Sequence, residues 1–152
     1  MPWDLPEPHV IALSVSPADI DAYRHVNNAV YMSWFDETAW SHSAALGLPL
    51  ERCLALDRGM AVLRSVISYL KPAFESDAVR IATWLLPRQG LRISRRFQVV
   101  RAADETTLAR AEIEYACIEL SSGRPARWPA AFLECYRPIE TVLARYPALT
   151  PL

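Results

Sequence analysis

Hydrophobic residues recur with helical spacing over residues 28–46. The apolar, aromatic or methyl-bearing positions are Val30, Tyr31, Trp34, Phe35, Thr38, Ala45 and Leu46. Their spacing of three and four residues predicts a helix rather than a strand. Asn27 precedes this helix and is a good N-cap, because its side chain accepts hydrogen bonds from amides in the first turn. Gly47 suits the left-handed residue that ends a helix, and Pro49 prevents continuation, so both ends of the helix are predicted.

Alternation of apolar and polar residues predicts strands on both sides of this helix. One strand precedes it and is closed by Pro17. Four strands follow it, separated by turns at Lys71-Pro72, Pro87 to Gly90, and Asp104-Glu105. The predicted ranges are residues 10–15, 61–70, 79–85, 91–99 and 111–117. Short turns between consecutive strands favour an antiparallel meander of the last four.

One strand, one long helix and a run of strands predict an α+β fold in a single domain, residues 1–152. The long helix is the strongest candidate to cover the apolar face of the sheet, so five strands are expected to curl around it. Residues 129–146 are predicted to be partly helical, with an interruption at Pro138. Pairing of an exposed sheet edge with a second copy would protect it, so we expect a homodimer or a dimer of dimers.

Composition narrows the function classes. The chain has 152 residues, 52% of them hydrophobic, and a formal net charge of -1. Near-zero charge predicts no attraction to nucleic acid or to an anionic membrane. No signal peptide or membrane-spanning apolar run is recognisable, so a cytoplasmic location is expected. The three cysteines and three histidines lack metal-ligand spacing, so no metal and no cofactor is predicted.

Candidate chemistry lies immediately before the predicted helix. Residues 19–31 carry two carboxylates, Asp19 and Asp21, together with His25 and the amides Asn27 and Asn28. The first amides of a helix have no partner within it and point outward with the positive end of the dipole. Such amides stabilise an oxyanion, and a neighbouring carboxylate can activate water or attack a carbonyl. The alternative is that these residues only cap the helix and form turns.

The pattern Asp-x-Asp-x-x-x-His-Val-Asn-Asn-x-x-Tyr over residues 19–31, followed by Trp34-Phe35 and an acidic pair, resembles the hotdog-fold thioesterases of the 4-hydroxybenzoyl-CoA thioesterase type. It is especially similar to the bacterial long-chain acyl-CoA thioesterase branch. The stretch Ile67-Ser68-Tyr69-Leu70-Lys71-Pro72-Ala73 and the later strands extend the resemblance over most of the chain. The resemblance implies an antiparallel sheet of five or six strands around one central helix, and hydrolysis of an acyl-CoA thioester.

The resemblance also implies roles for individual residues. Asp21 matches the catalytic aspartate of the family, acting as general base or nucleophile. Asn28 matches the residue whose backbone N–H polarises the thioester carbonyl. The capping pattern independently places Asn28 at the first helical position, with a free amide. Asp19 is expected to be structural.

Substrate contacts are expected from His25, Asn27, Arg24, Tyr31 and Trp34, with the acyl chain running along the helix near Tyr31 and Trp34 toward a dimer interface. Many members of the family carry glycine where this chain has Arg24, so Arg24 either limits the turn or reaches a phosphate of CoA. Support of the loop is the favoured role for His25.

Other polar residues have more than one interpretation. Asp36 and Glu37 lie on the helix, where some relatives carry a catalytic carboxylate, but a solvated or interface role is favoured. An arginine-rich strip has two interpretations: its side chains contact the phosphates of CoA, or they are the polar residues of a strand surface exposed to solvent. The second interpretation is favoured. The members of the strip are Arg88, Arg92, Arg95, Arg96 and Arg101.

Two other function classes are alternatives to a thioesterase. A non-catalytic module that binds acyl-CoA or an acyl-carrier protein is the main alternative. A hotdog dehydratase is disfavoured because its Asp and His signature is spaced differently. The chain has no Gly-x-Ser-x-Gly motif, which argues against a serine hydrolase.

Overall fold

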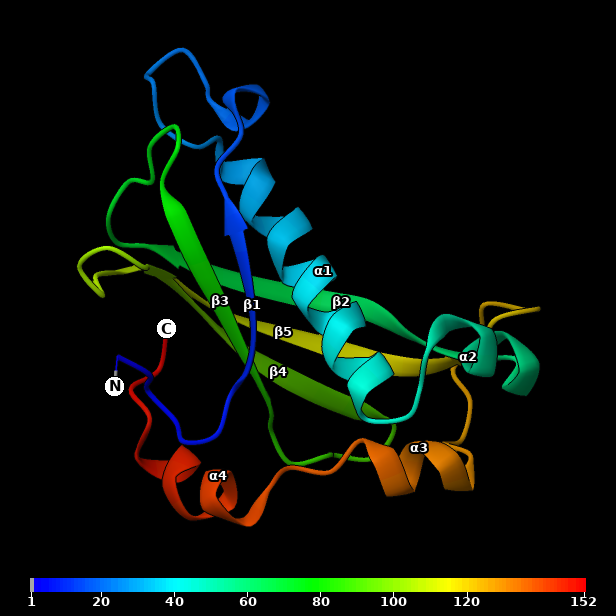
Figure 1. Cartoon of the computed structure of the whole chain (residues 1–152). Coiled ribbons are helices and arrows are strands. Elements are labelled where there is room, and N and C mark those ends of the chain that lie inside the picture. Colours follow the sequence, from blue (N-terminus) through cyan, green and yellow to red (C-terminus); the bar gives the residue numbers. More distant parts are fainter. Residues whose placement is uncertain (1) are drawn as a thin grey trace.

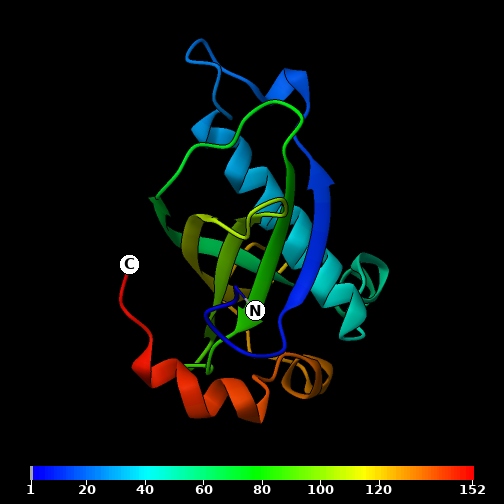
Figure 2. The ribbon, with the colours of Figure 1, turned by 60° about the vertical axis from the view of Figure 1, so that its left-hand side comes forward.

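A computed structural model describes residues 2–152 as an antiparallel sheet with a long helix against one of its faces (Figure 1). The strands are β1 (His9–Ser14), β2 (Arg58–Tyr69), β3 (Ala78–Leu85), β4 (Arg92–Arg101) and β5 (Thr107–Glu119). The helices are α1 (Asn28–Ala45), α2 (Leu50–Leu56), α3 (Ala130–Cys135) and α4 (Glu140–Arg145), with short 3-10 turns at Pro17–Asp19 and Tyr146–Ala148. The curved sheet partly encloses α1, as the turned view in Figure 2 shows. The predicted α+β hotdog fold is confirmed.

Both ends of α1 are formed by the residues that the sequence indicates. The side chain of Asn27 accepts a hydrogen bond from the amide of Ala29 at 2.9 Å. At the other end, Leu46 caps the helix and Gly47 follows with φ +102°, a backbone conformation that strongly favours glycine. The helix is therefore delimited by its local sequence.

The strand order differs from the prediction. The sheet order is β1-β3-β4-β5-β2, so only β3, β4 and β5 form a consecutive meander. A meander of the last four strands would place β2 beside β3. In the structure β1 pairs with β3 instead and forms that edge of the sheet. β2 instead pairs with β5 over most of its length and forms the opposite edge. The paired residues of β2 and β5 lie 40 to 61 positions apart, from Tyr69 with Ala109 to Arg58 with Glu119, and such long-range pairing is not indicated by the short turns of the sequence.

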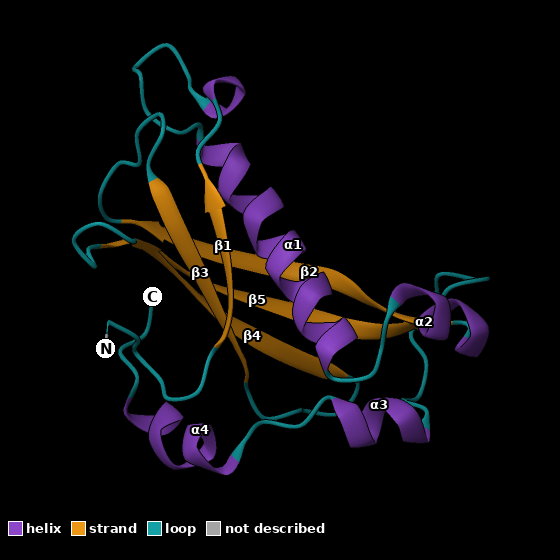
Figure 3. Ribbon diagram, in the orientation of Figure 1, coloured by secondary structure: helices purple, strands orange, loops and turns teal. Residues whose placement is uncertain are grey.

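The core lies between α1 and the facing side of the sheet. Phe35 of α1 and Phe97 of β4 are fully buried, with ring centroids 4.9 Å apart. The short helix α2 was not predicted. Its seven residues are too few to show a clear helical spacing of hydrophobic positions. Helices α3 and α4 flank Pro138, as expected for residues 129–146 (Figure 3). None of the helices among residues 2–152 combines the length and apolarity needed to span a bilayer.

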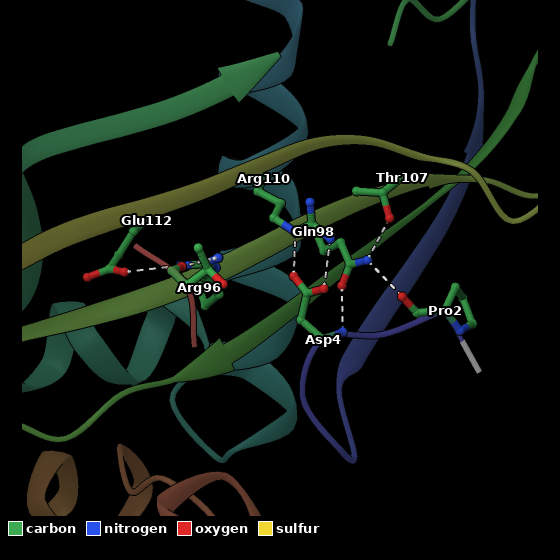
Figure 4. Close-up of polar contacts among 8 residues, drawn as sticks. Pro2, Asp4, Arg96, Gln98, Thr107, Arg110 and Glu112 are labelled. Atoms are coloured by element: carbon green, nitrogen blue, oxygen red, sulfur yellow. Dashed lines mark hydrogen bonds and ion pairs between the residues drawn. The ribbon is translucent and has the colours of Figure 1, made fainter. Parts of the chain in front are cut away.

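The outer face of β4 faces solvent only in part: Arg92 is exposed, as expected, but the later polar residues of this face are covered. Arg96 and Gln98 are buried beneath the terminal segments. The Gln98 side chain donates to the carbonyl of Pro2 and accepts from the amide of Asp4, at 2.9 and 2.8 Å (Figure 4). Arg110 forms a two-point ion pair with Asp4, at 2.7 and 2.9 Å. These bonds satisfy polar groups that the terminal segments cover.

Candidate functional site

The candidate site is a loop that leads from β1 into α1. Ile20 and Val26 form an isolated antiparallel bridge, and the Asn27 amide donates to the carbonyl of Asp19 at 2.9 Å. The Val26 amide donates to the carbonyl of Ala73, in the β2–β3 connection, also at 2.9 Å. The loop is therefore closed on itself and anchored to a segment about fifty residues away in sequence.

Asp21 lies at the base of this closed loop, partly buried. Its amide donates to the carbonyl of His25 at 2.9 Å. Its carboxylate oxygen Oδ1 accepts from the amides of Tyr23 at 2.9 Å and His25 at 3.4 Å. Among residues 2–152, no hydrogen bond involves the second oxygen, Oδ2. The loop thus orients the carboxylate through Oδ1 and leaves Oδ2 for another partner.

Asp19, the second carboxylate of the loop, has a capping role. Its Oδ2 accepts from the amide of Ser16 at 3.0 Å, and the Ser16 hydroxyl accepts from Ala18. This reciprocal arrangement is a capping box around the turn at Pro17–Asp19. The expectation that Asp19 is structural agrees with these bonds.

Asn28 is the first residue of α1, as the capping pattern predicts. Its backbone amide donates no hydrogen bond within the part of the chain that the structure describes. The N–H of Asn28 can therefore donate to another group at the positive end of an 18-residue helix. A carbonyl oxygen that develops negative charge would be stabilised at such a position.

Tyr69, at the end of β2, contacts the start of α1 and was not recognised from sequence. Its hydroxyl donates to the carbonyl of Asn28 at 3.1 Å, and its ring packs edge-on against Tyr31 with centroids 5.2 Å apart. The bond joins residues 41 apart in sequence. Tyr69 therefore helps to position the helix N-terminus, and nothing in its local sequence indicates this.

His25 and Arg24 occupy exposed positions in the loop. The His25 ring packs edge-on against Phe74 at 5.4 Å, which agrees with a supporting role. Arg24 has φ +61°, in the left-handed region. A residue with a Cβ atom costs about 1 kcal/mol or more there, which is a physical reason for the glycine that the resemblance leads one to expect at this position. Its side chain forms no ion pair among residues 2–152.

Tyr31 and Trp34 differ from the other expected substrate contacts in being buried. Their exposed fractions are 3% and 4%, and their rings lie 4.9 Å apart within the core. They pack α1 against the rest of the protein. In this single chain their side chains do not offer an open path for an acyl group.

The arginine-rich strip is divided between different environments. Arg92 pairs with Glu114 at 3.1 Å, Arg96 with Glu112 at 3.6 Å and Arg101 with Asp77 at 3.1 Å. Arg95 lies on the face of β4 opposite to Arg92 and Arg96, toward α1, and is buried, whereas Arg88 precedes the strand and lies over the ring of Trp128. The five residues thus do not form one basic surface. No group of three or more His, Cys, Asp or Glu residues within residues 2–152 is arranged to hold a metal ion.

Residues 15–135 match the family described as the Thioesterase-like superfamily. A comparison with curated protein sequences returned no match.

Solved structures share the fold at low sequence identity. A 1,4-dihydroxy-2-naphthoyl-CoA thioesterase from Synechocystis superposes with a TM-score of 0.76 at 19% identity, over 86% of this chain and 96% of that one. The YbaW probable thioesterase from Escherichia coli gives 0.72 at 22% identity, over 85% and 99%. A Staphylococcus aureus protein solved in complex with CoA gives 0.77 at 16% identity, over 96% and 88%.

Proposed function

Because the chain belongs to the thioesterase-like superfamily, we propose that it hydrolyses an acyl-CoA thioester to a free acid and CoA, with Asp21 as the catalytic carboxylate and the Asn28 amide as the oxyanion donor. One observation carries this proposal: loop amides orient the Asp21 carboxylate just before a helix whose first amide, that of Asn28, donates no hydrogen bond among residues 2–152. The Ile20–Val26 bridge and the Asn27 to Asp19 backbone bond tie the segment that carries Asp21 to the segment that leads into Asn28, which supports their use in one site.

The protein offers a group for each step of the proposed reaction. In the general-base route, Oδ2 of Asp21 takes a proton from water as the water oxygen bonds to the thioester carbonyl carbon. The carbonyl oxygen becomes negative and accepts from the Asn28 N–H. When the oxyanion collapses, the carbon–sulfur bond breaks, and the proton held by Asp21 passes to the CoA thiolate. In the nucleophilic route, Oδ2 bonds to the carbonyl carbon, the carbon–sulfur bond breaks and CoA leaves as a thiolate. Water then hydrolyses the resulting anhydride to the free acid and the Asp21 carboxylate, and the proton released in this step passes to the thiolate.

A non-catalytic acyl-CoA or acyl-carrier-protein binding module is the second candidate. The observation in its favour is the bonding of Asp21 Oδ1 to two loop amides, which is also how a purely structural aspartate stabilises a turn. The two functions differ in whether CoA is released.

The test is thiol release from acyl-CoAs ranging from acetyl to palmitoyl and including aromatic acyl groups. The wild type is expected to release CoA, and the Asp21→Asn variant is expected to lose about 10²–10⁴-fold in rate, the usual contribution of a positioned acid or base. Asparagine keeps the Oδ1 acceptor, so the loop bonds persist.

Asp19→Asn is the matched control, because it makes the same change at the carboxylate that caps the neighbouring turn. It is expected to retain activity. Full activity in a folded Asp21→Asn variant would exclude Asp21 as the catalytic group. Binding of acyl-CoA by the wild type without thiol release would establish the binding module instead.

A further inference from the structure

The β2–β3 connection holds the loop that carries Asp21 at both of its ends, and the two segments lie side by side (Figure 1). The amide of Val15, just before the loop, donates to the carbonyl of Asp77 at 2.8 Å. The amide of Val26, at the far end of the loop, donates to the carbonyl of Ala73 at 2.9 Å. Val15, Val26 and Ala73 are all buried, so water does not compete for these bonds. The position of the loop therefore depends on the shape of the β2–β3 connection.

Arg101, the last residue of β4, holds the β2–β3 connection in shape. Its Nη2 donates to the carbonyl of Pro72 at 2.7 Å, and its Nε donates to Oδ2 of Asp77 at 3.1 Å. The same carboxylate oxygen accepts from the amide of Phe74 at 2.9 Å. The guanidinium also lies over the Phe74 ring, 5.8 Å from its centroid. One side chain thus bonds to residues on both sides of the bend in the connection.

The sheet brings Arg101 to this segment. Arg101 pairs with Val79 at the start of β3, so the end of β4 lies beside the residues that lead into β3. Its remaining nitrogen, Nη1, donates to Asp104 in the β4–β5 turn at 3.3 Å. A guanidinium makes these bonds together because its N–H groups form a rigid planar fork. A lysine ammonium is a point charge and does not reproduce that fork.

A second contact links the β2–β3 connection to the loop through aromatic rings. The Phe74 ring, beneath the guanidinium of Arg101, packs edge-on against the ring of His25 at 5.4 Å. The carbonyl of His25 accepts from the amide of Asp21, and the amide of His25 donates to the Asp21 carboxylate. Arg101 is therefore connected to Asp21 by the backbone bond at Val26 and by the ring contact at His25.

We propose that Arg101 is a positioning residue for the reaction at Asp21, an inference that rests on the proposed function. By holding the carbonyl of Pro72 and the carboxylate of Asp77, it keeps the loop in the place where Asp21 can react. Each of its three nitrogens already bonds to the protein, so Arg101 acts through the loop and not on the substrate. Loss of its bonds should therefore slow the chemical step and leave substrate binding unchanged.

The first test is the rate of thiol release by Arg101→Lys, with the acyl-CoA that the wild type hydrolyses fastest. This substitution keeps the positive charge but loses the planar fork. A displacement of about 1 Å at a reacting group costs up to ~10²-fold in rate, so kcat is expected to fall about 10–100-fold. KM is expected to stay close to the wild-type value, because no substrate contact is removed.

Arg80→Lys is the matched control. Arg80 lies on the neighbouring strand β3, pairs with Glu105 at 3.6 Å and lies over the ring of Trp3 at 5.5 Å. It thus has an ion pair and an aromatic contact like those of Arg101, but within residues 2–152 its side chain makes no ion pair with the β2–β3 connection. It is expected to keep the wild-type kcat. Circular dichroism gives the folded fraction of each variant, and each rate is divided by that fraction, so partial unfolding is not mistaken for lost positioning.

Amide hydrogen exchange, followed by NMR, tests the same contacts without a substrate. In Arg101→Lys, the amides of Val15 and Val26 are expected to exchange at least about tenfold faster than in the wild type, because the segment that holds them opens more often. The amide of Leu46, at the other end of α1, is expected to keep its rate. In Arg80→Lys, the amides of Val15 and Val26 are expected to exchange as in the wild type.

A wild-type kcat in Arg101→Lys, an equal loss in Arg80→Lys, or unchanged exchange at Val26 would each overturn the inference. A wild type that releases no thiol would refute the proposed function and, with it, a catalytic role for Arg101. Faster exchange at Val26 in Arg101→Lys would then still identify Arg101 as the residue that holds the loop, so the two failures are distinguishable.

Discussion

Two adjacent arginines show how much the environment of a single residue depends on the face of a strand. Arg95 and Arg96 are neighbours in β4, and both are buried. Arg95 faces α1 and bonds to the side chains of His42 and Ser43. Arg96 faces the terminal segments and pairs with Glu112. Successive side chains point to opposite faces of a sheet, so one arginine lies on the helix side of the sheet and the other anchors the outer layer.

The His42 imidazole predicts a specific pH dependence of stability. Its pKa is about 3 in the folded protein and near the ordinary 6.5 when the chain is unfolded. Below pH 6.5 the unfolded chain takes up a proton that the folded protein does not, so folding stability falls as the pH drops toward 3. One proton corresponds to at most ~1.4 kcal/mol per pH unit, reduced here because His42 is only partly buried.

This is measured by urea unfolding of the wild type and His42→Gln between pH 7 and pH 4. Glutamine keeps an acceptor for Arg95 but does not titrate. The free energy of unfolding of the wild type is expected to fall more steeply than that of His42→Gln, by roughly 1 kcal/mol per pH unit below pH 6. Parallel curves would show that His42 does not titrate differently in the two states.

At the scale of elements, the N-terminus of α1 is held by residues near it in sequence and by residues far from it. Asn27 caps the helix from within the local sequence. Tyr69 of β2 holds the carbonyl of Asn28, and the carbonyl of Ala73 holds the amide of Val26. The direction of the free Asn28 amide is therefore determined by the helix and by the β2–β3 connection together.

An Asn28→Pro variant tests this amide directly. Proline has no N–H, yet it is favoured at the first position of a helix, and the extended conformation of Asn27 (φ -60°, ψ 138°) is compatible with a following proline. If the amide is the oxyanion donor, kcat for thioester hydrolysis is expected to fall about 10²–10³-fold while the protein stays folded. Asn28→Ala keeps the amide and is expected to retain activity. Equal rates in the two variants would remove the amide from the proposed mechanism.

At the scale of the whole molecule, the two edges of the sheet differ. Only Val10 of β1 is a large exposed hydrophobic residue at that edge. Along β2 and the segment after it, the exposed hydrophobic residues are Val62, Leu63, Tyr69, Leu70 and Phe74. An apolar edge strand with unpaired backbone groups favours pairing with another chain. β2 is thus the better candidate for the expected dimer interface.

Sedimentation equilibrium tests this arrangement. The wild type is expected to have the mass of a dimer or of a dimer of dimers, and Leu63→Lys is expected to shift it toward the monomer, because a charge at the edge strand disfavours pairing. Leu143→Lys introduces the same charge at a similarly exposed leucine of α4 and is expected to leave the mass unchanged. A monomeric wild type, or an unaltered mass in Leu63→Lys, would contradict an interface at β2.

Sequence by itself determined the features that depend on near neighbours. The bounds of α1, with Asn27 and Gly47 at its ends, follow from capping and backbone preferences that act within a few residues. The positions of the strands follow from alternation. The motif before α1 indicated the thioesterase-like family, which the match over residues 15–135 confirms.

Tertiary structure decided the features that depend on residues far apart in the chain. β2 lies beside β5 because β1 occupies the edge of β3, which no local pattern reveals. Tyr69 reaches Asn28 only because the sheet curves around α1, and Arg101 reaches Pro72 and Asp77 only because β4 pairs with β3. Local preferences select elements, but burial and charge compensation are properties of the assembled molecule, since they depend on which elements pack together.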